Sequence, residues 1–213
     1  ARAEPPYISE LVADNSGQLL DGDGNASDWI EIHNPTPSRI DISGYFLTDD
    51  PLIPDKWPFP EGTLLEAGEF LVIFASNQPT NSHIDTGGNL HTNFALNNNG
   101  EYLALIAADA STVVDAFAPY FPPIPADVSY GPDGYFITPS PGAINEDNAL
   151  LGFVKDTKFS INRGFHSTPF DLTITTGTKG AEIFYTTDGS APSPSNGSLY
   201  TRPLPITTTT VIR

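Results

Sequence analysis

The sequence predicts an all-β protein that is built from two β-sandwiches in tandem. Apolar and β-branched residues gather in short runs, and each run is bounded by Gly, Asn, Asp or Pro, as is typical of strands between turns. The chain holds 18 glycines and 21 prolines, which demand many turns. No stretch shows a persuasive 3.6-residue apolar stripe, so long helices are not expected.

The first part of the chain contains most of the predicted strands. They are expected at residues 7–13, 28–34, 69–75, 101–107 and 111–118. In the second of these, side chains alternate, so that Trp29, Glu31 and His33 share one face and Ile30 and Ile32 share the other. The runs FLVIF and LALI are almost continuously apolar, which predicts that they lie in the middle of a sandwich rather than at its edge.

The composition excludes several classes of partner and site. The formal net charge is −17, from 26 Asp and Glu against nine Lys and Arg, so we expect neither nucleic acid nor anionic lipid as a partner. Cysteine is absent, which excludes disulfides and cysteine–zinc sites. No run of about 18 apolar residues is present, so we expect no membrane insertion.

The first three residues indicate where the protein is found. Ala1-Arg2-Ala3 has the A-x-A pattern of a signal-peptide cleavage site. This pattern predicts a secreted or cell-surface (extracellular) protein, and a chance occurrence of small residues is the alternative.

A change of composition between residues 139 and 158 predicts a domain boundary. Two prolines, a glycine and polar residues stand at its start, and threonine becomes frequent after it. We therefore expect a first domain at 4–146, a linker at 147–158 and a second domain at 159–213. The second domain is at the small end for an independent hydrophobic core.

Residues 8–50 carry a pattern that resembles the bacterial lamin-tail domain. Ile8-Ser9-Glu10 begins a strand, an acidic glycine-rich loop follows, and DWIEIHN and IDISGYFLTDD continue the pattern. The segments 56–76, 90–106 and 127–145 extend it over nearly the whole first domain. The resemblance implies an immunoglobulin-like β-sandwich.

Residues 180–213 resemble the small immunoglobulin- or fibronectin-like domain at the C-terminus of chitobiases and hexosaminidases. YTTDGSAP at 185–192 and LYTRPLPI at 199–206 carry this resemblance. In that family the chain normally continues into a final strand, whereas this sequence stops at Arg213, which would leave the second immunoglobulin-like sandwich without its last strand. Such an open edge would accept a strand from another domain or chain of the parent protein by β-augmentation.

The loop DGDGNASD at 21–28 is the sharpest candidate site. It places side-chain oxygens at alternate positions between glycines, and this arrangement suits a hard cation such as Ca²⁺. The pattern departs from an EF-hand, because Ala26 and Ile32 stand where Gly and Glu would be needed. The alternative is an acidic turn that binds its own backbone. We expect a structural calcium ion to be bound by Asp21, Asp23, Asn25, Asp28 and Glu31.

Aromatic residues beside prolines offer a second kind of site. Trp57, Tyr120 and Phe121 stand in proline-rich segments, where exposed rings would stack on the apolar faces of sugars. They predict carbohydrate binding, with a polysaccharide as partner, as an alternative function. The competing interpretation is that these rings close the open ends of the sandwich.

Catalytic patterns are missing from the sequence. No G-x-S-x-G is present, the four histidines lack the H-E-x-x-H spacing, and no glycine-rich phosphate loop precedes a helix. We therefore expect no enzyme activity. The sequence predicts a non-catalytic structural or interaction module of a secreted or cell-surface bacterial protein, stabilised by calcium, that spaces or presents other domains or joins an assembly. A carbohydrate-binding accessory module is the alternative.

Overall fold

The computed structural model describes residues 6–145 and 148–213. Every regular element within these residues is a strand, which confirms the all-β class. The expected cleavage site at 1–3 lies outside the described residues, as do the predicted ends of the first domain at 4 and 146. Among the described residues, no helix has the length and hydrophobicity needed to cross a membrane.

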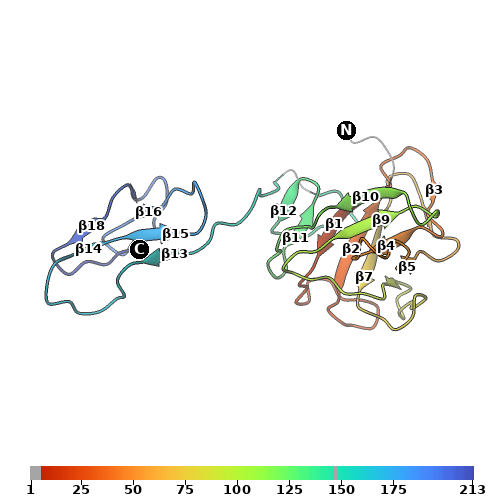
Figure 1. Ribbon diagram of the computed structural model, residues 1–213, viewed down its shortest axis with the longest axis horizontal. Coiled ribbons are helices and arrows are strands. Elements are labelled where there is room, and N and C mark those ends of the chain that lie inside the picture. Colours follow the sequence, from red (N-terminus) through yellow and green to blue (C-terminus); the bar gives the residue numbers. More distant parts are fainter. Residues whose placement is uncertain (1–5, 146–147) are drawn as a thin grey trace. The chain divides into compact units, whose positions relative to one another are not determined.

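The chain forms two compact units, Ala1–Gly152 and Phe153–Arg213 (Figure 1). The first strand of the second unit begins at Thr157, inside the segment for which the sequence indicated a linker.

A six-stranded sheet in the order β12-β11-β1-β2-β7-β8 forms one layer of the first unit. Its neighbours are antiparallel except for β7 and β8, which are parallel. The strands are β1 (Tyr7–Val12), β2 (Asp28–His33), β7 (Phe70–Ala75), β8 (Leu90–His91), β11 (Ser129–Gly131) and β12 (Gly134–Phe136).

A four-stranded antiparallel sheet in the order β10-β9-β4-β5 forms the other layer. Because β7 and β9 lie inside their sheets, the prediction that FLVIF and LALI are central strands is confirmed. The strands of this layer are β4 (Phe46–Thr48), β5 (Trp57–Pro58), β9 (Leu103–Ile106) and β10 (Val113–Phe117), and a separate pair joins β3 (Ile40–Asp41) to β6 (Leu64–Leu65).

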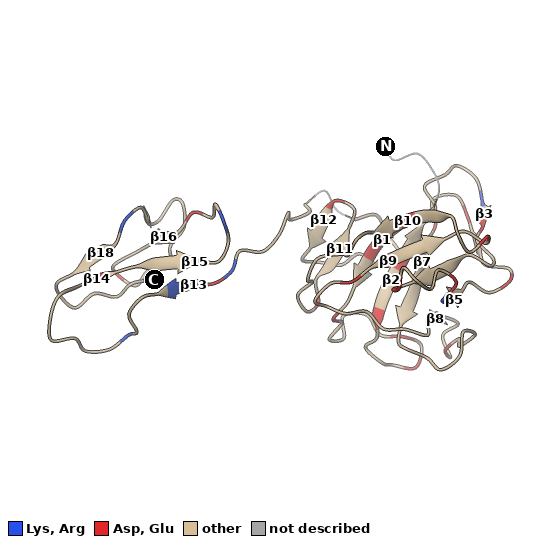
Figure 2. Cartoon of the chain, in the orientation of Figure 1, with Lys and Arg blue, Asp and Glu red and all other residues tan. Residues whose placement is uncertain are grey.

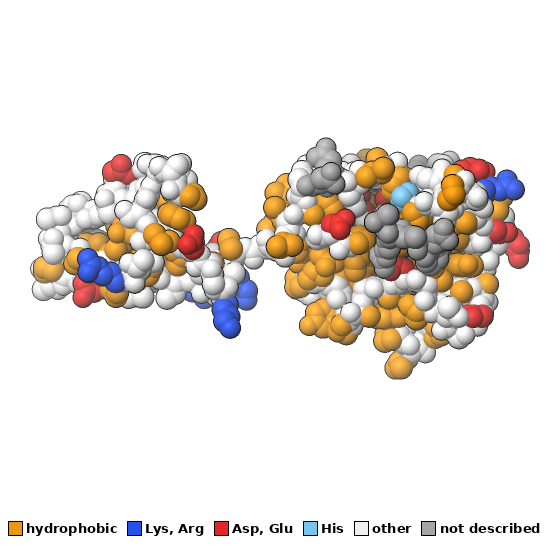
Figure 3. All heavy atoms as spheres, turned by 90° about the horizontal axis from the view of Figure 1, so that it is seen from above, with side chains coloured by type: hydrophobic (Ala, Val, Ile, Leu, Met, Phe, Trp, Pro, Cys, Tyr) orange, Lys and Arg blue, Asp and Glu red, His pale blue; other side chains and the backbone are white. Residues whose placement is uncertain are grey.

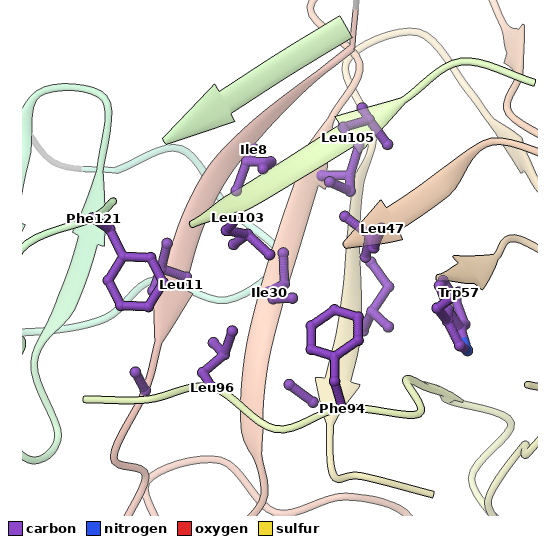
Figure 4. Close-up of a cluster of buried hydrophobic side chains, with 14 of the residues drawn as sticks. Ile8, Leu11, Ile30, Leu47, Trp57, Phe94, Leu96, Leu103, Leu105 and Phe121 are labelled. Atoms are coloured by element: carbon purple, nitrogen blue, oxygen red, sulfur yellow. The ribbon is translucent and has the colours of Figure 1, made fainter. Parts of the chain in front are cut away.

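The hydrophobic core of the first unit is made by side chains of both sheets (Figure 4). Ile30 and Ile32 of β2 belong to this core. Trp29 lies on the opposite face of β2, where it packs with Val12 and Phe74 in a smaller cluster. The predicted alternation of β2 is therefore confirmed, and the six-stranded sheet has an outer face that is also covered.

The second unit consists of short strand pairs. Its strands are β13 (Thr157–Phe159) with β15 (Ile174–Thr176), β14 (Phe170–Leu172) with β18 (Leu204–Ile206), and β16 (Phe184–Tyr185) with β17 (Ser198–Leu199). Near the end of the chain, the amide nitrogen of Thr186 donates to the carbonyl of Arg213 over 3.0 Å. Leu172 and Ile174 are the buried hydrophobic residues among the described residues of this unit.

Candidate functional site

The acidic loop at 21–28 is closed by hydrogen bonds to its own backbone. The Asp21 carboxylate accepts the amide of Asp23 over 3.0 Å and that of Asn25 over 2.8 Å. The Ser27 hydroxyl donates to the same carboxylate over 3.3 Å. Burial acts to raise the pKa of Asp21, but these hydrogen bonds outweigh it and lower the pKa.

Asp85 fastens this loop to a second loop that the sequence did not single out. Its carboxylate accepts the amide of Gly22 over 2.6 Å and the amides of Gly87 and Asn89 over 2.9 Å. Burial opposes the charge on Asp85, yet the hydrogen bonds from Asn89, His91 and Gly22 hold its pKa far below the usual range. A Cβ on Gly22 would lie 2.3 Å from the Gly87 nitrogen, so the close approach of the two loops requires glycine.

The structure brings together some of the five predicted calcium ligands and separates the others. Asn25 lies against Asp21, and Asp23 accepts the amide of Thr86 over 3.2 Å. Asp28 instead accepts the amide of Asn15 over 3.2 Å. Glu31 is held on the outer face of the six-stranded sheet. Within 6–145 and 148–213, no group of three or more His, Asp or Glu is arranged to hold a metal ion, and calcium binding stays a prediction.

Burial raises the pKa of Asp28 to about 6, and the nearby Asp14 carboxylate contributes to this shift. The Asp28 side chain is therefore in an environment that disfavours its charge, in contrast to Asp21.

Glu10 and Glu31 form a buried carboxylate pair on the neighbouring strands β1 and β2, and Figure 2 shows acidic positions in red on both strands. Both residues are 0% exposed, and they are register partners. The Ser9 hydroxyl and the Gly142 amide each donate to Glu31 over 2.6 Å. The Ser129 hydroxyl donates to Glu10, and the Ser140 amide lies 3.1 Å from each of its oxygens.

This pair fastens residues 139–145, which we call the strap, onto the outer face of the sheet. The Asn145 side chain adds a hydrogen bond to the Ser9 carbonyl over 2.9 Å. Neither Glu10 nor Glu31 has a Lys or Arg partner in the described part of the chain. Burial raises the pKa of both carboxyls, that of Glu31 to about 7, and the charge of Glu10 adds to the shift at Glu31.

Ser76, His91 and Asp85 lie in hydrogen-bonding order, as in a hydrolytic triad. The Ser76 hydroxyl is 2.7 Å from His91 Nδ1, and His91 Nε2 is 3.1 Å from Asp85. However, the amides of Asn77 and Gln78 donate to the carbonyls of Phe94 and Thr92 and are not free to form an oxyanion hole.

The His91 side chain is also 1% exposed and stacks on Phe74, so a substrate has no access to it. The arrangement joins Ser76, directly after β7, and His91 of β8 to Asp85.

The predicted glycan-stacking rings are mostly buried. Trp57 and Phe121 are each 0% exposed and belong to the core of the first unit, whereas Tyr120 is 64% exposed (Figure 4). The prediction that Trp57 and Phe121 stack on sugars is therefore wrong, because neither ring face reaches solvent. The competing interpretation, in which these rings close the open ends of the sandwich, agrees with the burial of Trp57 and Phe121. Prolines next to an aromatic residue therefore do not predict whether its ring is buried or exposed.

The second unit contains a cleft of about 440 Å³. Its walls come from the segments 159–170 and 206–212. The sequence did not predict this cleft, because its two walls are far apart along the chain. The aromatic rings lie in 159–170, and the consecutive threonines lie in 207–210.

Two family models match the chain. The Lamin Tail Domain matches residues 3–120, and the chitobiase/beta-hexosaminidase C-terminal domain matches residues 161–213. Both are immunoglobulin-like all-β domains, so the predicted tandem arrangement is confirmed. No curated protein and no solved structure matches the chain. The first match spans more than half of the sequence, and the chain therefore belongs to the Lamin Tail Domain family.

Proposed function

We propose that the chain is a non-catalytic structural and interaction module of a secreted or cell-surface protein, in which it spaces or presents neighbouring domains. Immunoglobulin-like domains of the two matched families are generally non-catalytic. The observation that carries the proposal is the use of the buried carboxylates Glu10, Glu31 and Asp85, which fasten loops to the first unit.

A catalytic acid or base must come within hydrogen-bonding reach of its substrate. Glu10 and Glu31 are buried beneath the strap, and the side chain of Asp85 is 0% exposed. The cleft of the second unit is lined by none of these residues, nor by Ser76 or His91. This placement supports stabilisation rather than turnover as the role of the buried polar groups.

An activity assay with two serine variants tests the non-catalytic role. We expect the wild type, Ser76→Ala and Ser16→Ala to give no hydrolysis of chromogenic ester, amide or glycoside substrates above background. Ser16 is exposed and serves as the matched control. Turnover that Ser76→Ala abolishes and Ser16→Ala retains would overturn the proposal.

The second unit supports interaction by strand addition. Its regular strands form three separate pairs, so each strand has an edge without a ladder partner among the described residues. Unpaired N–H and C=O groups of this kind can receive a strand from another domain or chain. The sequence predicts addition at the C-terminal edge, but Thr186 and Arg213 already exchange backbone hydrogen bonds there, so the free edges are those of β13, β17 and β18.

Hydrogen exchange tests strand addition, whichever domain or chain supplies the strand. We expect the amides of β13, β17 and β18 to exchange quickly in the isolated chain and slowly in a complex with the domain or chain that adds a strand. Equal exchange in both would contradict strand addition. The amides of β2 and β7, which are paired on both sides, provide the internal reference.

Carbohydrate binding is the second candidate function. Of the three predicted stacking rings only Tyr120 is exposed, so the specific observation in favour is the cleft of the second unit, which also contains exposed rings. A titration with oligosaccharides tests this function, with Phe165→Ala as the variant that removes one ring of the cleft.

A further inference from the structure

We propose that the cleft of the second unit binds a glycan whose sugars carry carboxylate groups. This inference rests on the second candidate function and is independent of the structural role. The cleft volume of about 440 Å³ lies within the range of small-molecule sites, and the cleft is lined by both rings and polar side chains.

Exposed rings supply the apolar part of the cleft. Phe165 is 109% exposed and Phe159 is 44% exposed, and both line the cleft together with Phe170. The ring of His166 meets Phe170 edge-on, with 4.8 Å between the centroids. Large rings left in water are costly unless a ligand covers them, and flat aromatic faces suit the apolar C–H faces of sugars.

Hydroxyl and amide groups supply the polar part. Thr207, Thr208, Thr209 and Thr210 follow one another along the cleft, and Asn162 lies among the other lining residues. These groups both donate and accept hydrogen bonds, as sugar hydroxyls require. Their number and close spacing along one side of the cleft suit the several hydroxyls of a sugar ring.

The charge of the cleft selects an acidic sugar. Arg163 and His166 line the cleft, and no Asp or Glu lines it. The Arg163 guanidinium has no hydrogen bond or ion pair in the described part of the chain, so its fork of donors is available for a carboxylate. His166 Nε2 lies 3.3 Å from the Asn162 carbonyl, which leaves Nδ1 for the ligand.

The residues of the second unit carry six Lys and Arg against four Asp and Glu, a formal charge of +2. In the view of Figure 3, most of the visible Lys and Arg atoms belong to this unit. The local charge therefore permits an anionic ligand here, although the whole chain is strongly acidic.

Calorimetric titration of the full chain with two matched oligosaccharides tests the inference. The probes are a trimer of galacturonic acid and the neutral trimer of galactose. We expect the acidic trimer to bind, and Arg163→Gln to weaken its binding about tenfold, because one charge-assisted contact is lost. Arg202→Gln, which removes an exposed arginine outside the cleft, should leave the affinity unchanged.

Phe165→Ala separates ring stacking from charge. It should weaken the binding of the acidic trimer about fivefold or more, since one stacking contact is removed. If the neutral trimer also binds, its affinity should fall by the same factor. Because the Phe165 side chain is fully exposed, this variant keeps the fold, which circular dichroism checks.

The remaining outcomes separate specificity for acidic sugars from carbohydrate binding in general. Equal binding of the acidic and neutral trimers, or no effect of Arg163→Gln, would overturn the acidic specificity and leave carbohydrate binding intact. No binding of either trimer would overturn both. A dimer in light scattering that Phe165→Ala dissociates, without glycan binding, would show that a second copy of the chain fills the cleft instead.

Discussion

The two units bury their side chains to very different extents. In the first unit, two sheets enclose a large hydrophobic cluster, and Trp29, Val12 and Phe74 form another on the outer face. In the described residues of the second unit, Leu172 and Ile174 are the buried hydrophobic residues, while Phe159 and Phe165 remain exposed. Since hydrophobic burial supplies most of the driving force for folding, we expect the first unit to be the more stable of the two.

The units also differ in charge. Residues 1–152 carry 22 Asp and Glu against three Lys and Arg, a formal charge of −19, whereas the second unit carries +2. The first unit can bury several carboxylates because amide and hydroxyl groups of its loops pair with them. The first unit thus uses buried acids to fasten its loops, whereas the smaller second unit leaves most of its polar side chains exposed.

Core truncation should reveal the largest difference between the units. Leu47 is 0% exposed in the centre of the first unit, and Leu47→Ala should cost about 2–5 kcal/mol of unfolding free energy. Leu172→Ala in the second unit should cost about 2 kcal/mol or less, because fewer side chains surround it. Both tryptophans lie in the first unit, so urea unfolding followed by tryptophan fluorescence reports on that unit.

Far-UV circular dichroism reports on both units, and we expect its transition to begin at lower urea than the fluorescence transition. The expected difference in stability between the units is wrong if the two transitions coincide and Leu172→Ala shifts the fluorescence transition as much as Leu47→Ala does.

The stability of the first unit should fall as pH rises from 5 to 8. Burial, together with the charge of Glu10, raises the pKa of Glu31 to about 7, from 4.5 for an unperturbed side chain. The folded state therefore favours the protonated carboxyl. Its stabilising contribution is complete below pH 4.5 and is lost as the pH rises through 7, and it amounts to about 3 kcal/mol. Asp28, with a pKa of about 6, acts in the same direction.

Urea midpoints measured by tryptophan fluorescence at pH 5, 6, 7 and 8 provide the test. Glu31→Gln keeps a neutral side chain of the same size and should flatten most of the slope. The lowered pKa values of Asp21 and Asp85 affect stability only at more acidic pH. A midpoint that rises between pH 5 and 8 in the wild type would show that the pair is ionised without cost.

Local patterns in the sequence predicted the strands and their faces well. The alternation of β2 places Ile30 and Ile32 in the core because side-chain direction depends only on the pleat of one strand. The same pleat also determines where Glu31 lies. This residue is close in sequence to the acidic loop, but it points to the outer face, where it binds the strap.

Contacts between distant segments could not be predicted in this way. The Gly142 amide that binds Glu31 is 111 residues away, and the Gly22 amide that binds Asp85 is 63 residues away. The local sequence of a segment does not indicate which distant residue it will bind. For the same reason the sequence left open which of Trp57, Tyr120 and Phe121 would be buried, since exposure depends on which elements of the fold cover a ring.

Gly22→Ala should disturb the junction of the two loops in the first unit. The added Cβ would lie 2.5 Å from the Asp85 carboxylate as well as close to the Gly87 backbone, so the loops must separate. We expect a loss of about 1–3 kcal/mol in unfolding free energy. Gly152→Ala, where a Cβ meets nothing within 4 Å, is the control and should have almost no effect. Equal melting temperatures for both variants would show that the contact between the two loops does not contribute to the stability of the first unit.

Calcium should have the smallest effect. The Asp21 carboxylate already accepts two loop amides and the Ser27 hydroxyl, and Asp28 and Glu31 are engaged elsewhere. Because these donors already close the loop, the calcium ion predicted from the sequence can bind only if the loop rearranges, and without that rearrangement the melting midpoint is the same in calcium and in EDTA. A ligand that binds only the folded state must raise the midpoint as its concentration increases. A calcium-dependent rise that Asp23→Asn abolishes would therefore show that the loop rearranges around a cation, as its alternating oxygens predict. Asp188→Asn changes an acidic turn of the second unit and is the matched control, because its loss should leave any such rise intact.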